Sequence, residues 1–184
     1  MKKIVEMFNG SPRKRGNTQV FLDALCDQFE DLNYKVEQTR LYDIDLSPCI
    51  DCRACKTGDK DCIVQDGMQK LYTRLEKADM IIFGTPIYWF GPSAVMKGLM
   101  DRLRPYYKNE KLKGKKAILV TPAGNGALDW DLTIEMFKRT FVSLGIEFVG
   151  AVTSESYDIG DAAKDFQGLK QIDIIIKSLY PQCS

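Results

Sequence analysis

Short apolar runs alternate along the chain with longer segments in which apolar residues recur every three or four positions. The runs predict five strands, at Lys3–Asn9, Lys35–Leu41, Met80–Thr85, Lys116–Thr121 and Ile146–Thr153. The third and fourth runs are continuously apolar, which is typical of strands covered on both faces of a sheet. The intervening segments predict five helices, at Asn17–Leu32, Asp66–Lys77, Ser93–Leu103, Leu132–Leu144 and Asp161–Leu179.

This order of elements predicts an α/β fold. Five β-α units with right-handed crossovers form a doubly wound parallel sheet with helices on both faces. The flavodoxin-like strand order 2-1-3-4-5 suits five strands better than a six-stranded dinucleotide fold. We therefore expect a single domain over residues 1–184, with a cysteine-rich insertion at residues 47–65 after the second strand.

Composition narrows the possible chemistry. The 184 residues include no histidine, which excludes Ser-His-Asp hydrolases, zinc sites that need histidine and His-ligated haem. With 26 basic and 25 acidic residues, the chain lacks the strong positive charge typical of nucleic-acid binders. No apolar run is long enough for a membrane span or a signal peptide. We expect a cytoplasmic protein that binds neither nucleic acid nor membrane.

The loop after the first strand combines small polar residues with three consecutive cations. It runs over residues 10–18 and leads into a helix that Asn17, or Gly16 before it, is expected to cap. Exposed backbone amides at a helix start, together with the cations at residues 13–15, predict a phosphate site. The loop is neither a Walker A sequence nor a G-x-G-x-x-G sequence. A solvated surface run is the alternative interpretation of the cations.

Two later loops complete the same edge of the predicted sheet. Residues 85–93 place three adjacent aromatics, Tyr88, Trp89 and Phe90, where they cannot all face a core. A flat ligand or a neighbouring subunit could cover them, and filling the gap between helix and sheet is the alternative. Residues 121–127 are small, so the backbone there can approach a ligand closely.

Together these loops resemble a known family. The sequences G-S-P-R-x-x-G-N-T at residues 10–18 and T-P-I-Y-W-F-G-P-S-A-V-M-K-G-L-M-D-R at residues 85–102 are similar to those of the flavodoxin-like NADPH-dependent FMN reductase superfamily. The resemblance implies bound FMN and no catalytic side chain, because the chemistry resides in the cofactor. It implies that the phosphate lies on Ser11, Arg13, Gly16, Asn17 and Thr18. It further implies that the isoalloxazine ring lies against Pro86, Ile87, Tyr88, Trp89 and Phe90, with Thr121, Ala123, Gly124 and Asn125 on the other side.

Four of the six cysteines are gathered in fourteen residues, in the pattern Cys49-x2-Cys52-x2-Cys55-x6-Cys62. Three cysteines in quick succession favour an iron–sulfur cluster over zinc, and a metal-free loop is a further alternative. Within the superfamily, a segment of this kind after the second strand resembles that of the iron–sulfur flavoproteins. This resemblance implies a [4Fe–4S] cluster on the four cysteines and a ferredoxin-like electron donor, which puts direct oxidation of NAD(P)H in doubt. We expect Cys26 to be a buried apolar thiol and Cys183 a bystander.

Three functions follow as hypotheses. The first is an FMN-dependent oxidoreductase in which a [4Fe–4S] cluster exchanges electrons with a protein donor and FMN passes them to a small-molecule acceptor. The second is an NAD(P)H-dependent FMN or quinone reductase that is metal-free or holds zinc. The third is a flavodoxin-like electron carrier with no substrate of its own. The aromatic run at residues 88–90 and the segment Pro105-Tyr106-Tyr107 offer apolar surface that a lone domain would expose. They predict a homo-oligomer, a dimer or a tetramer, in which the cysteine loop of one subunit lies close to the flavin site of another.

Overall fold

Five parallel strands form the central sheet of the computed structural model, which describes residues 2–58 and 61–183. The strands are β1 (Ile4–Asn9), β2 (Lys35–Arg40), β3 (Met80–Gly84), β6 (Lys116–Ala123) and β7 (Glu147–Glu155). Their order is β2-β1-β3-β6-β7, and every neighbouring pair is parallel. The predicted order 2-1-3-4-5 is therefore confirmed.

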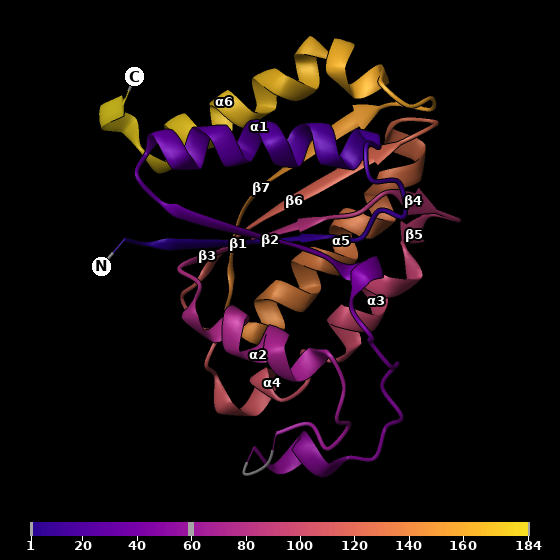
Figure 1. Ribbon diagram of the computed structural model, residues 1–184, viewed down its shortest axis with the longest axis vertical. Coiled ribbons are helices and arrows are strands. Elements are labelled where there is room, and N and C mark those ends of the chain that lie inside the picture. The colour runs from indigo at the N-terminus through magenta and orange to yellow at the C-terminus, as the bar shows by residue number, and fades with distance from the viewer. Residues whose placement is uncertain (1, 59–60, 184) are drawn as a thin grey trace.

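Helices cover both faces of this sheet (Figure 1). One layer holds α1 and α6, and the other holds α2 to α5. Their bounds are α1 (Asn17–Asp31), α2 (Met68–Lys77), α3 (Ala94–Asp101), α4 (Tyr106–Asn109), α5 (Ala127–Leu144) and α6 (Phe166–Leu179). Short 3-10 helices occupy Leu41–Asp43, Ala54–Thr57, Asp161–Lys164 and Pro181–Cys183.

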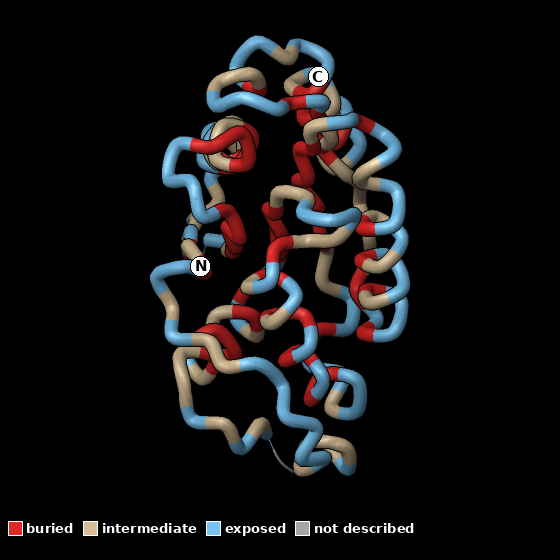
Figure 2. Tube along the Cα trace, turned by 90° about the vertical axis from the view of Figure 1, so that its right-hand side faces the viewer, coloured by how far each residue is buried: buried red, intermediate tan, exposed pale blue. Residues whose placement is uncertain are grey.

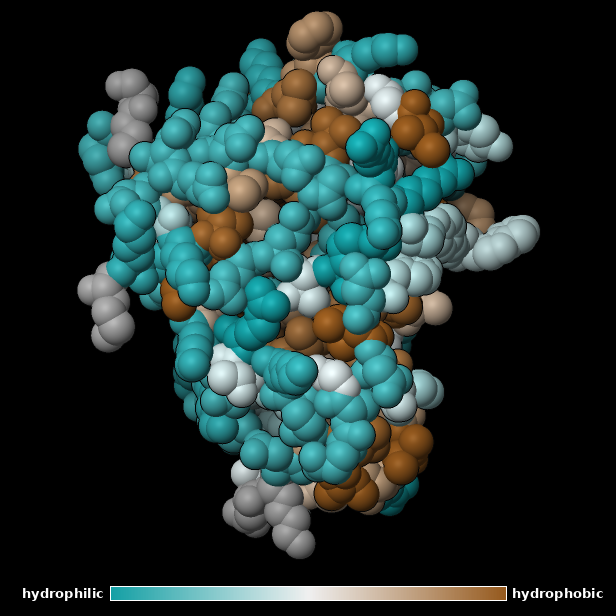
Figure 3. Space-filling model, in the orientation of Figure 1, coloured by the Kyte–Doolittle hydropathy of each residue, from teal (hydrophilic) through white to brown (hydrophobic). Residues whose placement is uncertain are grey.

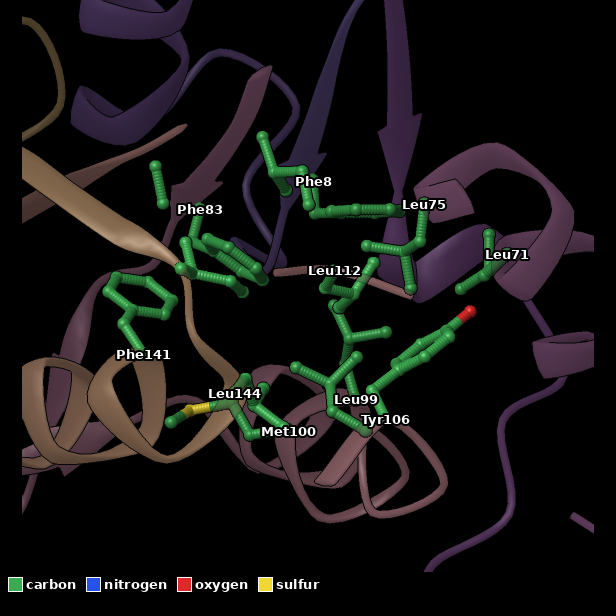
Figure 4. Close-up of a cluster of buried hydrophobic side chains, with 14 of the residues drawn as sticks. Phe8, Leu71, Leu75, Phe83, Leu99, Met100, Tyr106, Leu112, Phe141 and Leu144 are labelled. Carbon is green, nitrogen blue, oxygen red and sulfur yellow. The ribbon is translucent and has the colours of Figure 1, made fainter. Parts of the chain in front are cut away.

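Each helical layer encloses a separate apolar core. The smaller core lies between α1, α6 and the sheet. The larger one lies beneath α2 to α5 and includes the aromatic rings of Phe83 and Phe141, whose centroids are 5.3 Å apart (Figure 4). Aromatic pairs at this distance stabilise a core beyond the area that they bury. The two cores hold the sheet rigid and fix the carboxyl ends of its strands, where the loops of interest begin.

Helices α2 and α3 begin within two residues of their predicted starts, whereas α5 and α6 each begin five residues away. Helix α5 begins at Ala127 instead of Leu132. Its first turns were not predicted because Leu128 and Leu132 are exposed there, and the stripe that faces the core starts only at Thr133. Helix α6 begins later than the predicted Asp161. The side chain of Asp165 accepts hydrogen bonds from the backbone amides of Gln167 and Gly168, so it caps the helix there.

A small hairpin was not predicted from the sequence. Two-residue strands β4 (Ile87–Tyr88) and β5 (Gly91–Pro92) pair antiparallel within the aromatic loop. Trp89 and Phe90 form its turn with φ angles of 49° and 63°, a conformation that large side chains rarely adopt. The turn projects from the carboxyl edge of the sheet (Figure 1).

The cysteine loop lies at the other end of α3 from this hairpin, beyond α2 and α4 (Figure 1). Its described residues, 47–58 and 61–65, are all half-buried or exposed (Figure 2). Apolar side chains gather over this end of the molecule (Figure 3). Among the described residues, no helix is both long enough and apolar enough to cross a membrane.

Candidate functional site

The loop between β1 and α1 is held by its own polar side chains. The Asn9 side chain accepts a hydrogen bond from the Ser11 amide at 2.7 Å, and the Ser11 hydroxyl accepts one from the Arg13 amide at 3.2 Å. A Cβ atom on Gly16 would lie 2.9 Å from that of Arg13, so the loop closes tightly only around glycine. Gly16 caps α1 without a side-chain hydrogen bond, so the first amides of the helix face a potential anion.

Asn17 braces a neighbouring loop. Its side-chain nitrogen donates to the carbonyl oxygens of Ser156 at 3.3 Å and Asp158 at 2.9 Å. Its oxygen accepts from the amides of Gly160 at 3.2 Å and Ala162 at 3.3 Å. The side chain is therefore occupied, and only the backbone amide of Asn17 is left to meet a phosphate. The N-cap of α1 is Gly16, the second of the two residues predicted to cap this helix.

One cleft of about 350 Å³ unites most of the residues predicted to bind FMN. The loop between β1 and α1, called the phosphate loop for the ligand predicted there, contributes Ser11, Arg13, Gly16, Asn17 and Thr18. The segment after β3 contributes Pro86, Ile87 and Tyr88, and the glycine loop at the end of β6 contributes Ala123, Gly124 and Asn125. The cleft therefore has a cationic end, an aromatic wall and a wall of small residues. These are the features that an anionic tail attached to a flat ring requires.

Three predicted residues do not line this cleft. Trp89 is 93% exposed, because the positive φ angles of the hairpin turn its ring into solvent, and Phe90 is half exposed beside it. Thr121 is fully buried on β6, where its hydroxyl has no partner among the described residues.

Five residues of the cleft were missed by the sequence reasoning: Pro122, Asp129, Ser156, Tyr157 and Asp158. The last three follow β7, the strand whose loop was not considered. Ligands of such sheets bind beyond the carboxyl ends of the strands, so inspection of the loops after all five strands would have found them. Asp129 accepts a hydrogen bond from the Asn125 amide at 3.0 Å and so fixes the glycine loop. Tyr157 packs so closely on Gly124 that a Cβ there would lie 2.9 Å from its ring.

A second cavity, of about 150 Å³, is lined by Cys49, Cys52, Cys55 and Cys62. All four candidate ligands therefore face one space, together with Asp101 and Arg104 from the end of α3. None of the five described cysteine side chains is in a disulfide. In the described part of the chain, no three Cys, Asp or Glu side chains are grouped closely enough to hold a single metal ion.

The thiols influence one another electrostatically. Burial raises the pKa of the Cys55 thiol, and the neighbouring Cys62 and Cys49 raise it further, whereas Arg104 lowers it. Cys26 lies on α1, far along the chain from this cavity, and is half-buried there rather than fully buried. The side chain of Cys183 lies outside the described residues.

A buried ion pair closes the base of the cysteine loop. Arg102 Nη1 donates to Asp66 Oδ2 at 2.8 Å, and Nη2 donates to Oδ1 at 3.0 Å. The same guanidinium donates to the carbonyl oxygens of Ser47 at 2.8 Å and Val64 at 3.3 Å. Burial alone would raise the pKa of Asp66, but hydrogen bonds from Arg102 and from the Ser47 amide outweigh burial and hold it below its usual value. Arg102 therefore ties both ends of the loop to α3.

Helix α3 connects the two sites. At its start, Ser93 caps the helix, and the Ser93 amide donates to Thr85 Oγ1 at 3.0 Å beside the cleft. At its end, Asp101 lines the thiol cavity and Arg102 holds the loop. The eight residues of the helix span about 12 Å between these two ends.

Comparisons with known proteins agree with this arrangement. Residues 3–141 match the family described as NADPH-dependent FMN reductase. An iron–sulfur flavoprotein of Methanocaldococcus jannaschii is 33% identical over 144 residues, which cover 77% of this chain and 73% of that protein. YwqN of Bacillus subtilis, named as an NAD(P)H-dependent FMN-containing oxidoreductase, is 29% identical over 182 residues, covering 94% of this chain and 96% of YwqN. The structure of the Trp repressor binding protein from Bacillus subtilis superposes with a TM-score of 0.71 at 24% identity, covering 94% of this chain and 97% of that one.

The structural likeness shows the fold, and the sequence matches show the family. The family match spans the phosphate loop, the aromatic hairpin and the glycine loop that together line the cleft. The chain belongs to the NADPH-dependent FMN reductase family, in its iron–sulfur flavoprotein branch, and is an FMN-dependent oxidoreductase.

Proposed function

We propose that this oxidoreductase holds both FMN and a [4Fe–4S] cluster and transfers electrons between a ferredoxin-like protein donor and a small-molecule acceptor. The observation that carries the proposal is the cavity onto which all four cysteines of one short loop face. When bound, FMN supplies one- and two-electron chemistry, and an iron–sulfur cluster supplies single electrons. The roles of the protein are to bind, orient and shield the two groups.

The FMN cleft supports a specific orientation. Arg13 and the first amides of α1 would hold the phosphate, because both favour negative charge. Pro86, Ile87 and Tyr88 would cover one side of the ring, and Ala123 with Gly124 would allow the backbone to approach the other. Trp89 and Phe90 have no part in this orientation, and we assign them to a subunit contact instead.

The arrangement of the thiols supports a cluster better than a zinc ion. Structural zinc takes four ligands at about 2.3 Å from one centre, so the sulfur atoms must converge. In a [4Fe–4S] cluster each iron takes its own thiolate, so the sulfur atoms surround a larger body. All four cysteines line one cavity, and the close spacing of the first three in the sequence favours the second case.

A second candidate function is an NAD(P)H-dependent FMN or quinone reductase that works without a cluster. The family match and the similarity to YwqN over nearly the whole chain favour a nicotinamide nucleotide as a partner. Rapid NADPH oxidation by protein that contains FMN but no iron would support this function. Reduction by a ferredoxin together with slow NADPH oxidation would support the first.

Single Cys→Ser variants test the proposed cluster. We expect variants at Cys49, Cys52, Cys55 and Cys62 each to lose the iron–sulfur absorbance and keep stoichiometric FMN, because the two sites lie at opposite ends of α3. Cys26→Ser is the matched control and should keep both the iron–sulfur absorbance and the FMN. A cluster that survives all four substitutions, or that Cys183→Ser removes, contradicts the assignment of the ligands.

A further inference from the structure

A separate hollow of about 200 Å³ borders the thiol cavity. It is lined by Cys55, Lys56, Arg104, Tyr107 and Lys108. Three of these five side chains are cations and none is an acid. We call this feature the cationic hollow.

Two of its three cations have no ion-pair partner among the described residues. Neither Arg104 nor Lys108 is in an ion pair with any residue that the structure describes. Lys56 lies 3.7 Å from Asp51, a longer contact than a strong ion pair makes. Asp101, the acid nearest along the chain to Arg104, is already paired with Lys97 at 2.6 Å. The local charge is therefore positive on a protein whose net charge is only +1.

The cationic hollow is physically part of the wall around the cysteines. Cys55, Lys56 and Arg104 line both it and the thiol cavity. The loop packs closely against α4 at this point, since a Cβ atom on Gly58 would lie 3.0 Å from that of Lys108. A molecule seated in the hollow would therefore contact Cys55 directly.

The surrounding surface is larger than a small anion needs. Arg104 and Tyr107 also line a neighbouring open hollow of about 530 Å³ that extends to Arg139 on α5. Tyr107 is 57% exposed between the two, and Lys108 Nζ lies 5.9 Å from the centre of its ring. Exposed tyrosine and arginine side by side are typical of protein interfaces, and positive patches steer acidic partners.

We propose that the cationic hollow is the docking surface for a small acidic one-electron carrier protein, which it holds against Cys55. This inference rests on the proposed function, because it gives the cluster an entrance for its donor. It adds which face of the molecule the donor uses and which side chains recognise it.

Binding of a small acidic [2Fe–2S] ferredoxin, measured by titration calorimetry on FMN-loaded protein at low and high salt, tests the proposal. The variants are Arg104→Glu with Lys108→Glu, and Lys108→Glu alone, which leaves the thiol cavity lining intact. Lys164→Glu with Lys170→Glu is the matched control, because these exposed lysines lie at the α6 end of the molecule (Figure 1). Iron and sulfide are counted for every variant.

We expect wild-type affinity to fall steeply with salt, the double variant to bind at least about tenfold more weakly, and the control to match wild type. Lys108→Glu should show an intermediate loss with an unchanged iron content. Wild-type protein that does not bind the ferredoxin at low salt, or equal losses in control and double variant, would overturn the proposal. Absence of iron from wild-type protein would instead count against the proposed function, whatever the binding result.

Discussion

The residue whose charge matters most to the proposed FMN site is Arg13. It is exposed at the cationic end of the cleft, beside the amides of the first turn of α1. We expect Arg13→Ala to weaken FMN binding by about 1.5–3 kcal/mol, the range for a hydrogen bond to a charged group. Riboflavin, which lacks the phosphate, should lose almost nothing.

Fluorescence titration of both ligands measures this difference. Arg15→Ala is the matched control, since Arg15 is an exposed cation of the same loop that does not line the cleft. Equal losses of FMN and riboflavin affinity in Arg13→Ala would show that the phosphate lies elsewhere.

Glu6 on β1 is a buried acid remote from both sites. Burial raises its pKa from 4.5 to about 7, which outweighs the lowering by Arg74 at 2.9 Å and by the Thr39 hydroxyl. The folded state therefore binds this proton more tightly than the unfolded state does. Between pH 4.5 and 7 the contribution of Glu6 to the free energy of unfolding should therefore fall as pH rises, by roughly 1–3 kcal/mol.

Urea unfolding at pH 5, 6, 7 and 8, with FMN in constant excess, measures this slope. Glu6→Gln cannot titrate, so its curve should be flatter than that of wild type over this window. Glu30→Gln, an exposed acid on α1, should leave the slope unchanged. If Glu6→Gln has the wild-type slope, Glu6 is not the group that titrates.

At the scale of elements, α3 and the loop that it anchors form one unit. Arg102→Ala would leave Asp66 buried without its partner, and breaking a buried ion pair in this way costs about 3–5 kcal/mol. We expect the cysteine loop to become sensitive to protease and to lose iron while FMN stays bound. Arg102→Lys keeps the charge but not the paired geometry, so it should restore only part of the iron content.

Limited proteolysis and iron counting check this expectation. Lys97→Ala removes an exposed ion pair from the same helix and should change neither readout. An Arg102→Ala protein with an intact loop and full iron content would show that the ion pair is dispensable for positioning the thiols.

The elements were predictable where a local pattern determines them. Alternating apolar runs and helical stripes predicted the five strands of the sheet, because strands buried on both faces leave a plain apolar signal. The order of the strands in the sheet followed from the doubly wound arrangement that suits five strands. The hairpin was not predicted, since nothing in an aromatic sequence indicates positive φ angles at Trp89 and Phe90. The Asp66–Arg102 pair was also missed, because it joins residues 36 positions apart.

The site was predictable to the same extent. The loops that follow strands could be located once the strands were predicted. The hydrogen bonds of the Asn17 side chain were not predictable, because they reach a loop that is more than 130 residues away in the sequence. The sequence spacing of the four cysteines anticipated a common site. It did not indicate that α3 supplies one wall of their cavity.

At the scale of the whole molecule, exposed apolar side chains lie on the two elements that contribute Tyr88 and Asp129 to the cleft. Trp89 and Leu128 are 93% and 80% exposed, on elements that meet where Thr133 Oγ1 donates to the Phe90 carbonyl oxygen at 3.1 Å. Surfaces of this kind mark subunit contacts. We predict a homodimer or homotetramer in which the cysteine loop of one subunit lies close to the flavin cleft of another.

Light scattering coupled to size exclusion measures the assembly, and Trp89→Asp should shift it toward monomer. Mixing a Cys52→Ser protein with one unable to bind FMN should restore transfer between the two sites in the mixed oligomer. A strictly monomeric wild-type protein that transfers electrons fully would leave only the path along α3 within one chain.

If the proposed function holds, one chain carries both an FMN and a four-iron cluster. The most direct measurement is a count of iron, acid-labile sulfide, zinc and FMN per chain in anaerobically purified protein, together with its visible spectrum. We expect about four iron atoms, about four sulfides and one FMN per chain. One FMN with a single zinc ion, or with no metal, would contradict this expectation and leave an FMN reductase whose cysteine loop has another purpose.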